Sequence, residues 1–211
     1  MQDFYDFNAK KWDATRRAAW GEFEFGRELL AAKKILDAGC GNGRLNFWLE
    51  GNNFTGEYFG VDLSAKLIEL ARKNFPQRNF AVKDLLNFIQ ENSFDAVFCV
   101  AVLHHFLSPE EQKKALANMF ASLQPGGKIF LTVWNLWQPR FWKLFLAQNF
   151  SRDLKIPFGR ASFREVHAFT KSELRKLLTT AGFKNVKIFY ARHGDRSNFL
   201  RGRNLIAIAE K

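Results

Sequence analysis

Three glycines and two aspartates form the part of the sequence best suited to bind a small ligand. Residues 35–44 read ILDAGCGNGR and contain Asp37, followed by three glycines at alternate positions, Gly39, Gly41 and Gly43. A glycine turn between a strand and a helix lets backbone N–H groups approach a ligand closely. Asp62 ends the next apolar run, 19 residues after Gly43, and an acid at this spacing suits the two hydroxyls of a ribose. The pattern predicts a site for a ligand that contains a ribose.

Alternating strand and helix patterns predict how these residues are positioned. Apolar strand patterns cover residues 33–37, 57–62, 78–83, 95–100 and 128–133, with helix patterns between them at 43–50, 64–74 and 108–123. Such alternation is typical of an open, doubly wound, mostly parallel sheet. A helix over 171–181 and two antiparallel strands over 184–192 and 204–210 complete an expected α/β, Rossmann-like sheet of seven strands.

Two further segments decorate this expected sheet. Helices over residues 4–17 and 22–32 form an N-terminal helical lid, residues 1–32. An aromatic and basic insertion follows the fifth strand over residues 135–169, with a helix near 141–148. The length of 211 residues suits a single domain, 1–211.

The glycine motif resembles that of a known superfamily. Its spacing is D-x-G-x-G-x-G rather than the G-x-G-x-x-G of dinucleotide enzymes, and it resembles motif I of the class I S-adenosylmethionine (SAM) methyltransferases. The resemblance implies SAM as the cofactor. It implies that Asp37 lies behind the loop, oriented toward its backbone or the cofactor's ammonium group, and that the three glycines surround the methionine end.

The remaining strand ends suggest how adenosine is held. Ligands bind at the carboxyl ends of strands in open α/β sheets, and three of the five strand ends carry an acid. We expect Asp62 to bind the ribose hydroxyls and Asp84 to accept from the adenine amino group. Leu63 and Leu85 form apolar plates for the adenine ring, and Val100 faces the site from the end of the fourth strand.

Segments along most of the chain resemble the tRNA wobble-uridine methyltransferases that esterify a carboxymethyl group on an anticodon uridine. The matching segments are Tyr5 with Trp12, TRRAAW at 15–20, DAGCGNGR at 37–44, VAVLHHF at 100–106, TVW at 132–134 with Gln138, DLKIPF at 153–158 and REVHAF at 164–169. The chain departs from the family pattern at Trp137, Phe158, Glu165 and Val166. These departures affect the predicted identity of the substrate nucleotide more than the predicted fold or cofactor.

The chemistry that the resemblance implies needs no general base, because a carboxylate is already ionised at neutral pH. The protein must hold the anion, exclude water and bring oxygen and methyl within about 3 Å. Arginine binds both carboxylate oxygens with its fork, so Arg16, Arg140 and Arg164 are candidates, with His167 as a helper. An alternative is that His105, or its neighbour His104, acts as a base or only braces its loop.

Aromatic side chains near arginine indicate a surface for unpaired bases. Single-stranded RNA is read by aromatic faces and cations, and Trp134 and Arg140 are the main candidates here, beside Trp137 and Trp142. The alternative is that these aromatics only pack the insertion, which is the simpler interpretation for Trp142 and Phe145.

Charge distribution also favours a polyanionic partner. The net charge is +11; residues 1–138 hold 16 Lys/Arg and 16 Asp/Glu, whereas residues 139–211 hold 16 Lys/Arg and 5 Asp/Glu. A one-sided basic surface suits tRNA, although it also suits a solvated face. The resemblance further implies that a small zinc-ribbon activator protein can cover an apolar edge strand.

The cysteines, the apolar runs and the N-terminal segment bear on the cellular location of the protein and on whether it binds a metal. Only two cysteines, Cys40 and Cys99, are present, and they lie in different predicted elements, so we expect no metal site or disulfide and a cytoplasmic protein. No apolar run is long enough for a membrane span, and the polar N-terminus is unlike a secretory signal.

Two other functions remain open at this point. One is a small-molecule O- or C-methyltransferase of the quinone-biosynthesis type, in which the glycine motif and L-H-H segment look similar. The other is a non-catalytic protein of the SAM fold that binds RNA or a partner; the intact Gly39, Gly41, Gly43 and Asp62 speak against it.

Overall fold

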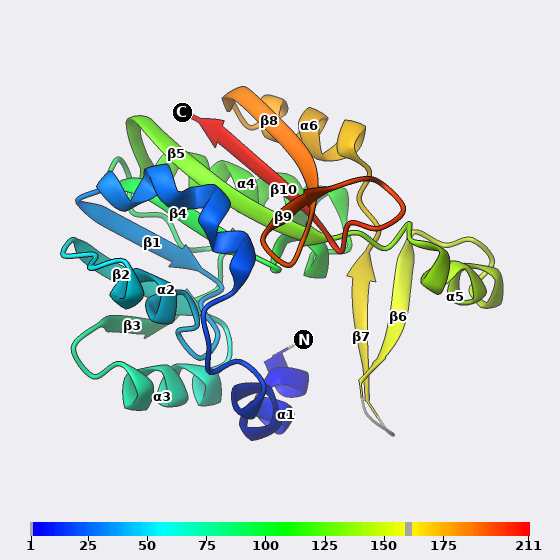
Figure 1. The fold of residues 1–211 in the computed structure, drawn as a ribbon, viewed down its shortest axis with the longest axis horizontal. Coiled ribbons are helices and arrows are strands. Elements are labelled where there is room, and N and C mark those ends of the chain that lie inside the picture. The colour runs from blue at the N-terminus through cyan, green and yellow to red at the C-terminus, as the bar shows by residue number, and fades with distance from the viewer. Residues whose placement is uncertain (1, 159–161) are drawn as a thin grey trace.

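The main sheet has eight strands, with order β3-β2-β1-β4-β5-β10-β8-β9 (Figure 1). A computed structural model describes residues 2–158 and 162–211, so three residues of the expected insertion lie outside it. The strands of the main sheet are β1 (Lys34–Ala38), β2 (Glu57–Asp62), β3 (Asn79–Val82), β4 (Phe94–Val100), β5 (Leu123–Trp134), β8 (Lys184–Arg192), β9 (Asp195–Ser197) and β10 (Asn204–Glu210). Strands β1 to β5 pair in parallel, and β10 pairs antiparallel with both β5 and β8.

The doubly wound Rossmann-like prediction is confirmed, but the expected number of seven strands was wrong. The additional strand is β9, three polar residues (DRS) that pair antiparallel with β8 at the sheet edge. A segment this short and polar has no apolar alternation, so its sequence gives no strand signal.

The insertion contains a hairpin that the sequence pattern did not predict. Strands β6 (Asp153–Phe158) and β7 (Ser162–His167) form a separate two-stranded antiparallel sheet. The expected helix nearby is α5 (Trp142–Ala147), preceded by a short 3-10 turn, η3 (Pro139–Phe141). Hairpin and α5 stand beyond the end of β5, to one side of the main sheet (Figure 1).

Helices cover both faces of the sheet, and β4 is buried between them. Val97 and Cys99 of β4 belong to a core shared with α4 (Pro109–Ser122) and α6 (Lys171–Thr180). Ala96 and Phe98 face a second core shared with α2 (Leu45–Gly51) and α3 (Ala65–Asn74). This alternation explains why β4 is almost continuously apolar, as expected for a central parallel strand.

The predicted helix starts are confirmed by their caps. Ser64, Ser108 and Thr170 each accept a hydrogen bond from the backbone N–H three residues ahead, and the last two form complete capping boxes. The expected second N-terminal helix is instead a 3-10 helix, η1 (Gly21–Ala31). Its buried Phe23, Gly26 and Leu29 recur every third residue, which matches the three residues per turn of a 3-10 helix.

The first helix, α1 (Gln2–Ala14), is attached near the carboxyl ends of the parallel strands by two aspartates. Asp6 Oδ1 accepts from Ser64 Oγ at 2.5 Å. Asp13 is buried, and its Oδ1 accepts from Asn42 Nδ2 at 2.8 Å and Asn74 Nδ2 at 3.1 Å. The N-terminal segment therefore covers the strand ends where a ligand is expected. None of the described helices is long and apolar enough to cross a membrane.

The cap of α6 gives a test of the fold. Thr170→Ala removes the acceptor for Glu173 N and should lower the free energy of unfolding by about 1 kcal/mol. Thr180→Ala changes an exposed threonine at the other end of the same helix and is the matched control, expected to have little effect. Urea denaturation measures both; equal losses for the two variants would contradict the capping interpretation.

Candidate active site

The glycine loop between β1 and α2 bends back over the end of β2. Gly39 N and Cys40 N donate to Val61 O at 2.8 and 2.9 Å. Gly39 and Gly41 have φ of +83° and +55°, a left-handed backbone that glycine adopts without steric cost. A Cβ on Gly39 would lie 2.2 Å from Val102 Cγ2, whereas a Cβ on Gly41 would have Trp12 Nε1 as its nearest neighbour, at 3.7 Å. Gly39 thus allows close packing, and Gly41 leaves space for a ligand.

Asp62 connects this loop to the next strand. Its Oδ2 accepts from Gly41 N at 2.8 Å, and its Oδ1 accepts from Ser64 N at 2.9 Å. Burial raises the pKa of Asp62, while the bonds from Ser64 and Gly41 oppose that shift. Each oxygen retains a further lone pair for a ligand hydroxyl.

A first cavity, of about 280 Å³, lies between the glycine loop, the ends of β2, β3 and β4, and α1. It is lined by seven of the nine predicted cofactor residues, which are Gly39, Gly41, Asp62, Leu63, Asp84, Leu85 and Val100. Most of the other wall residues are apolar, such as Leu67, Leu86 and Phe106. The first cavity is therefore an apolar slot with two acids, Asp62 at the glycine loop and Asp84 after the end of β3. This arrangement fits an adenosine.

The other two predicted cofactor residues lie outside the first cavity. Gly43 lies behind the loop, where a Cβ would come within 2.9 Å of Phe75, so it serves packing. Asp37 is buried, accepts from Tyr58 Oη at 2.8 Å and lines a second cavity. Burial raises the pKa of Asp37 to about 7; the bond from Tyr58 opposes this shift and the charge of Asp62 adds to it.

The second cavity, of about 360 Å³, lies on the other side of the glycine loop and is rich in cations and aromatics. Its walls include Arg16, Trp12 and Trp134, and it shares Gly39, Gly41, Val100 and Ala101 with the first cavity. The Arg16 guanidinium lies 3.4 Å from the centre of the Trp12 ring. Burial, together with the charges of Arg44 and Arg164, lowers the pKa of Arg16 to about 10, so it remains a cation at neutral pH.

Arg164, on β7, lies among aromatic rings. Its guanidinium is 4.5 Å from the Trp134 ring centre and 4.9 Å from that of Phe158. Its buried Nε has no hydrogen-bond partner among the described residues. A buried donor without an acceptor is costly, and an anionic ligand would satisfy it.

Trp134 and Arg140 lie together in a third cavity, of about 310 Å³, that opens beside Arg164. Trp134 belongs to the walls of both the second and the third cavity, whereas Arg140 borders only the third. Of the other aromatics of the insertion, Trp137 stacks on buried Phe145 at 4.9 Å and packs the insertion, while Trp142 is exposed.

His105 borders the first cavity and is held by the lid. Tyr5 Oη lies 2.8 Å from His105 Nε2. Burial lowers the pKa of His105 to about 4 and raises the pKa of Tyr5, so the neutral imidazole accepts a hydrogen bond from the neutral phenol. The neighbouring His104 is fully buried against Trp134 and lines neither cavity.

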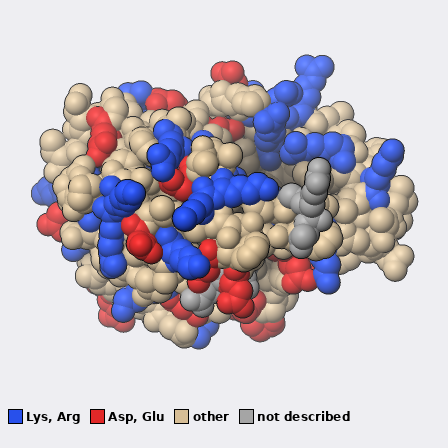
Figure 2. Space-filling model, turned by 90° about the horizontal axis from the view of Figure 1, so that it is seen from below, with Lys and Arg blue, Asp and Glu red and all other residues tan. Residues whose placement is uncertain are grey.

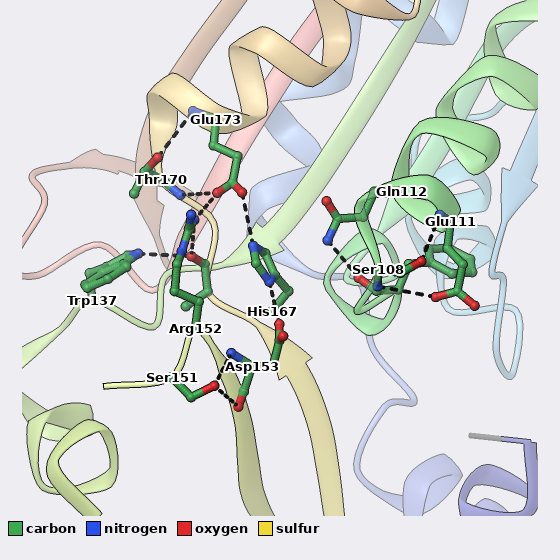
Figure 3. A network of polar contacts seen from close by, with 12 residues as sticks. Ser108, Glu111, Gln112, Trp137, Ser151, Arg152, Asp153, His167, Thr170 and Glu173 are labelled. Atoms are coloured by element: carbon green, nitrogen blue, oxygen red, sulfur yellow. Dashed lines mark hydrogen bonds and ion pairs between the residues drawn. The ribbon is translucent and has the colours of Figure 1, made fainter. Parts of the chain in front are cut away.

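His167 is separated from the other predicted catalytic residues. Nδ1 lies 2.5 Å from Asp153 Oδ1, and Nε2 lies 3.1 Å from Glu173 Oε1 (Figure 3). Glu173 also pairs with Arg152, so this network ties the hairpin to the start of α6. Because both ring nitrogens are engaged and His167 borders none of the three cavities, its contacts are those of a structural anchor rather than of a helper for Arg164.

Arg44, Arg203 and Ala101 are among the cavity residues that the sequence analysis did not name as site residues. Arg44 follows the glycine motif directly, a position that could have drawn attention to it. Arg203 borders the second and third cavities from just before β10, and only the antiparallel strand register brings it there. Ala101, with φ of +56°, lies between the first and second cavities, and such backbone strain has no sequence signal.

Comparison with known proteins agrees with this geometry. The family profile "Methyltransferase domain" matches residues 36–131. A protein of Encephalitozoon cuniculi described as a candidate methyltransferase is 31% identical over 191 residues, covering 86% of this chain and 85% of that protein. A SAM-dependent methyltransferase structure from Methanosarcina mazei superimposes with a TM-score of 0.69 at 22% identity, covering 84% of this chain and 92% of that one.

Another relative is a tRNA (carboxymethyluridine(34)-5-O)-methyltransferase of Arabidopsis thaliana. It is 34% identical over 132 residues, which is 62% of this chain but 31% of that protein, so this chain spans about a third of that relative's length. The chain belongs to the class I SAM-dependent methyltransferases. It is an enzyme, and its cofactor is SAM, which the first cavity fits.

The buried Asp37 predicts an unusual dependence of stability on pH. An unfolded Asp has a pKa of about 3.9, whereas burial raises the folded value to about 7. The stability that this proton adds is complete below the unfolded pKa and is lost as pH rises through about 7. Asp37→Asn keeps an acceptor for Tyr58 and does not titrate.

The free energy of unfolding of the wild type minus that of Asp37→Asn should therefore fall between pH 5 and pH 8, by at most about 3 kcal/mol. Urea denaturation without cofactor measures this difference at each pH. A difference that stays constant over this range would show that Asp37 does not titrate there.

Proposed function

We propose that this enzyme transfers a methyl group to the carboxylate of a carboxymethyl group on a tRNA wobble uridine. The observation that carries the proposal is the buried Nε of Arg164, which has no hydrogen-bond partner among residues 2–158 and 162–211, on a guanidinium that lies over Trp134. A cation ready for an anion, next to an aromatic face ready for a base, suits an acidic nucleobase. The name of the Arabidopsis relative supports the same substrate.

Arg16 and Arg164 approach the glycine loop from different elements. Arg16 lies in the second cavity, which shares its glycine wall with the first, and Arg164 lies in the third cavity beside Trp134, a residue that also lines the second. Arginine can bind both oxygens of a carboxylate and hold it in one orientation. We assign to this pair the orientation of the substrate anion.

The reaction requires the protein only to position the substrate carboxylate and to exclude water from the site. Bound SAM supplies a methyl group on a sulfonium, an electrophile that an ionised carboxylate can attack without proton transfer. The chain therefore has to bind the anion, align it and exclude water. Apolar and aromatic walls formed by Val100, Trp12 and Trp134 serve that exclusion.

His105 has a positioning role in this proposal. Its neutral ring accepts from Tyr5 and thereby fastens the N-terminal lid to the loop that follows β4. A base with a pKa of about 4 is weak at neutral pH, and the reaction needs none.

The proposal also includes a cytoplasmic location and a small activator protein as a partner. The two cysteines are buried and unpaired, which agrees with a reducing cytoplasm. A small zinc-ribbon activator would pair with β3, which ends the main sheet and bears the exposed Val82.

Arg164 gives the main test of the substrate. With tRNA that carries 5-carboxymethyluridine, Arg164→Ala should lower kcat/KM by about 10- to 150-fold, the equivalent of losing a hydrogen bond to a charged group. Arg164→Lys should lose nearly as much because it lacks the fork. SAM affinity should stay within about twofold, and Arg27→Ala, which breaks an exposed ion pair, is the control.

Nucleoside mass spectrometry of the product identifies the methyl ester. Methyl transfer to quinone precursors or other small acids, with none to tRNA, would refute the proposal in favour of a small-molecule methyltransferase.

The pH dependence of turnover tests the role of His105. At saturating SAM and tRNA, kcat should be flat between about pH 6 and pH 9, because the carboxylate is ionised and His105 is neutral throughout. His105→Gln keeps an acceptor for Tyr5 and should retain a flat profile. A break near pH 6.5 in the wild type that His105→Gln removes would instead identify His105 as a general base.

A further inference from the structure

Three arginines from separate elements gather at the outer side of the third cavity. Arg140 comes from η3, Arg192 ends β8 and Arg203 precedes β10. Arg140 and Arg203 both line the cavity, together with Trp134 and Phe141. Arg192 directly follows Ala191, whose O accepts from Arg203 N at 2.8 Å. Burial lowers the pKa of Arg140, and the charges of Arg203 and Arg192 add to this shift.

The strand register holds two of these arginines in place. Asn204 pairs with Trp134 on one side and with Ala191 on the other. Just before it, Arg203 N donates to Ala191 O at 2.8 Å, and Arg203 O accepts from Asn135 N at 2.9 Å. Arg203 is therefore fixed by its backbone between two strands, beside the end of β8 where Arg192 lies.

Two described carboxylates lie near these arginines without forming an ion pair with them: Asp195, and Glu22, which accepts from His193 N and Asn204 Nδ2. Arg140, Arg192 and Arg203 form no ion pair within residues 2–158 and 162–211, although Asp195 lies opposite Arg192 in the β8–β9 register. Adjacent like charges repel one another. Three neighbouring arginines that form no ion pair with a described residue thus favour an anion that is not part of the described chain.

We propose that Arg140, Arg192 and Arg203 form a clamp for a backbone phosphate of RNA, next to the nucleotide that is methylated. The clamp shares the third cavity with Trp134, so a base lying on Trp134 would have its own or a neighbouring phosphate at these arginines. Arginine forks suit phosphate oxygens, and such contacts fix the register of a nucleic acid without reading its sequence.

The surrounding surface agrees with an RNA rather than a single small anion. The excess of positive charge belongs to residues 139–211, which supply all three arginines. Figure 2 shows Lys and Arg side chains across the middle and right of the face that carries α1, with Asp and Glu scattered between them and along the lower margin. The proposal rests on the proposed function only in taking RNA as the substrate.

The test uses an unmodified anticodon stem-loop RNA, so that binding does not depend on which base is methylated. Fluorescence anisotropy would compare the wild type with Arg140→Gln/Arg192→Gln/Arg203→Gln over a series of salt concentrations. We expect the triple variant to bind at least tenfold more weakly and the slope of log K against log salt to shrink by about 0.7, the value for one lost phosphate contact.

The control is Lys73→Gln/Lys113→Gln/Lys176→Gln, which removes the same charge from exposed positions on α3, α4 and α6. Equal losses in both triple variants would overturn the clamp in favour of a general charge effect. A loss by the arginine variant on anionic phosphatidylserine vesicles but not on RNA would overturn it in favour of a membrane surface.

Methylation assays separate the clamp from the proposed function. With modified tRNA, the arginine variant should raise KM at least tenfold and change kcat less than threefold, because the clamp positions RNA and does not contact the reacting carboxylate. Specific loss of stem-loop binding in an enzyme that methylates no tRNA would support the clamp and refute the wobble reaction. Unchanged binding with normal wobble methylation would refute only the clamp.

Discussion

The site depends on the pair of hydrogen bonds by which Asp62 joins two backbone segments. One carboxylate oxygen accepts from Gly41 N in the glycine loop, and the other accepts from Ser64 N at the start of α3. The loop is fixed again where Gly39 N and Cys40 N donate to Val61 O. The end of β2 thereby sets the shape of the turn after β1, and the same carboxylate faces the first cavity. The Asp62 carboxylate therefore serves both to shape the glycine loop and to bind the ligand.

The glycine loop also separates the first cavity, which suits the cofactor, from the second cavity, which suits the substrate. On one side, an apolar slot with Asp62 and Asp84 fits adenosine. On the other side, Arg16 and Trp134 border a space suited to an acidic substrate. Because Gly39, Gly41 and Ala101 line both spaces together with Val100 and Trp12, a cofactor and a substrate bound in them would meet at this shared wall. The lid helix α1 contributes Trp12 to both cavities, so it helps to keep them dry.

The sequence predicted best those features that follow from local pattern and strand order. Asp62, Leu63, Asp84 and Leu85 could be placed because parallel strands bring their carboxyl ends to one edge, and the glycine spacing indicated the ligand. The capped starts of α3, α4 and α6 followed from the same local rules.

What it could not predict depends on distant contacts. The position of Arg203 follows from antiparallel register, and the contacts of His167 follow from the way the β6–β7 hairpin meets α6. The eighth strand is too short and polar to show a pattern, and η1 differs from an α-helix only in how its buried residues repeat. The same limits explain why Arg140 could be named while its two arginine neighbours could not.

The most direct test of the cofactor site is a crystal structure of the enzyme with S-adenosylhomocysteine. We expect the ribose hydroxyls on the Asp62 carboxylate, the adenine between Leu63 and Leu85, and the amino-acid end beside Gly39 and Gly41. A ligand bound elsewhere, or one in this cavity with its ribose away from Asp62, would contradict this expectation.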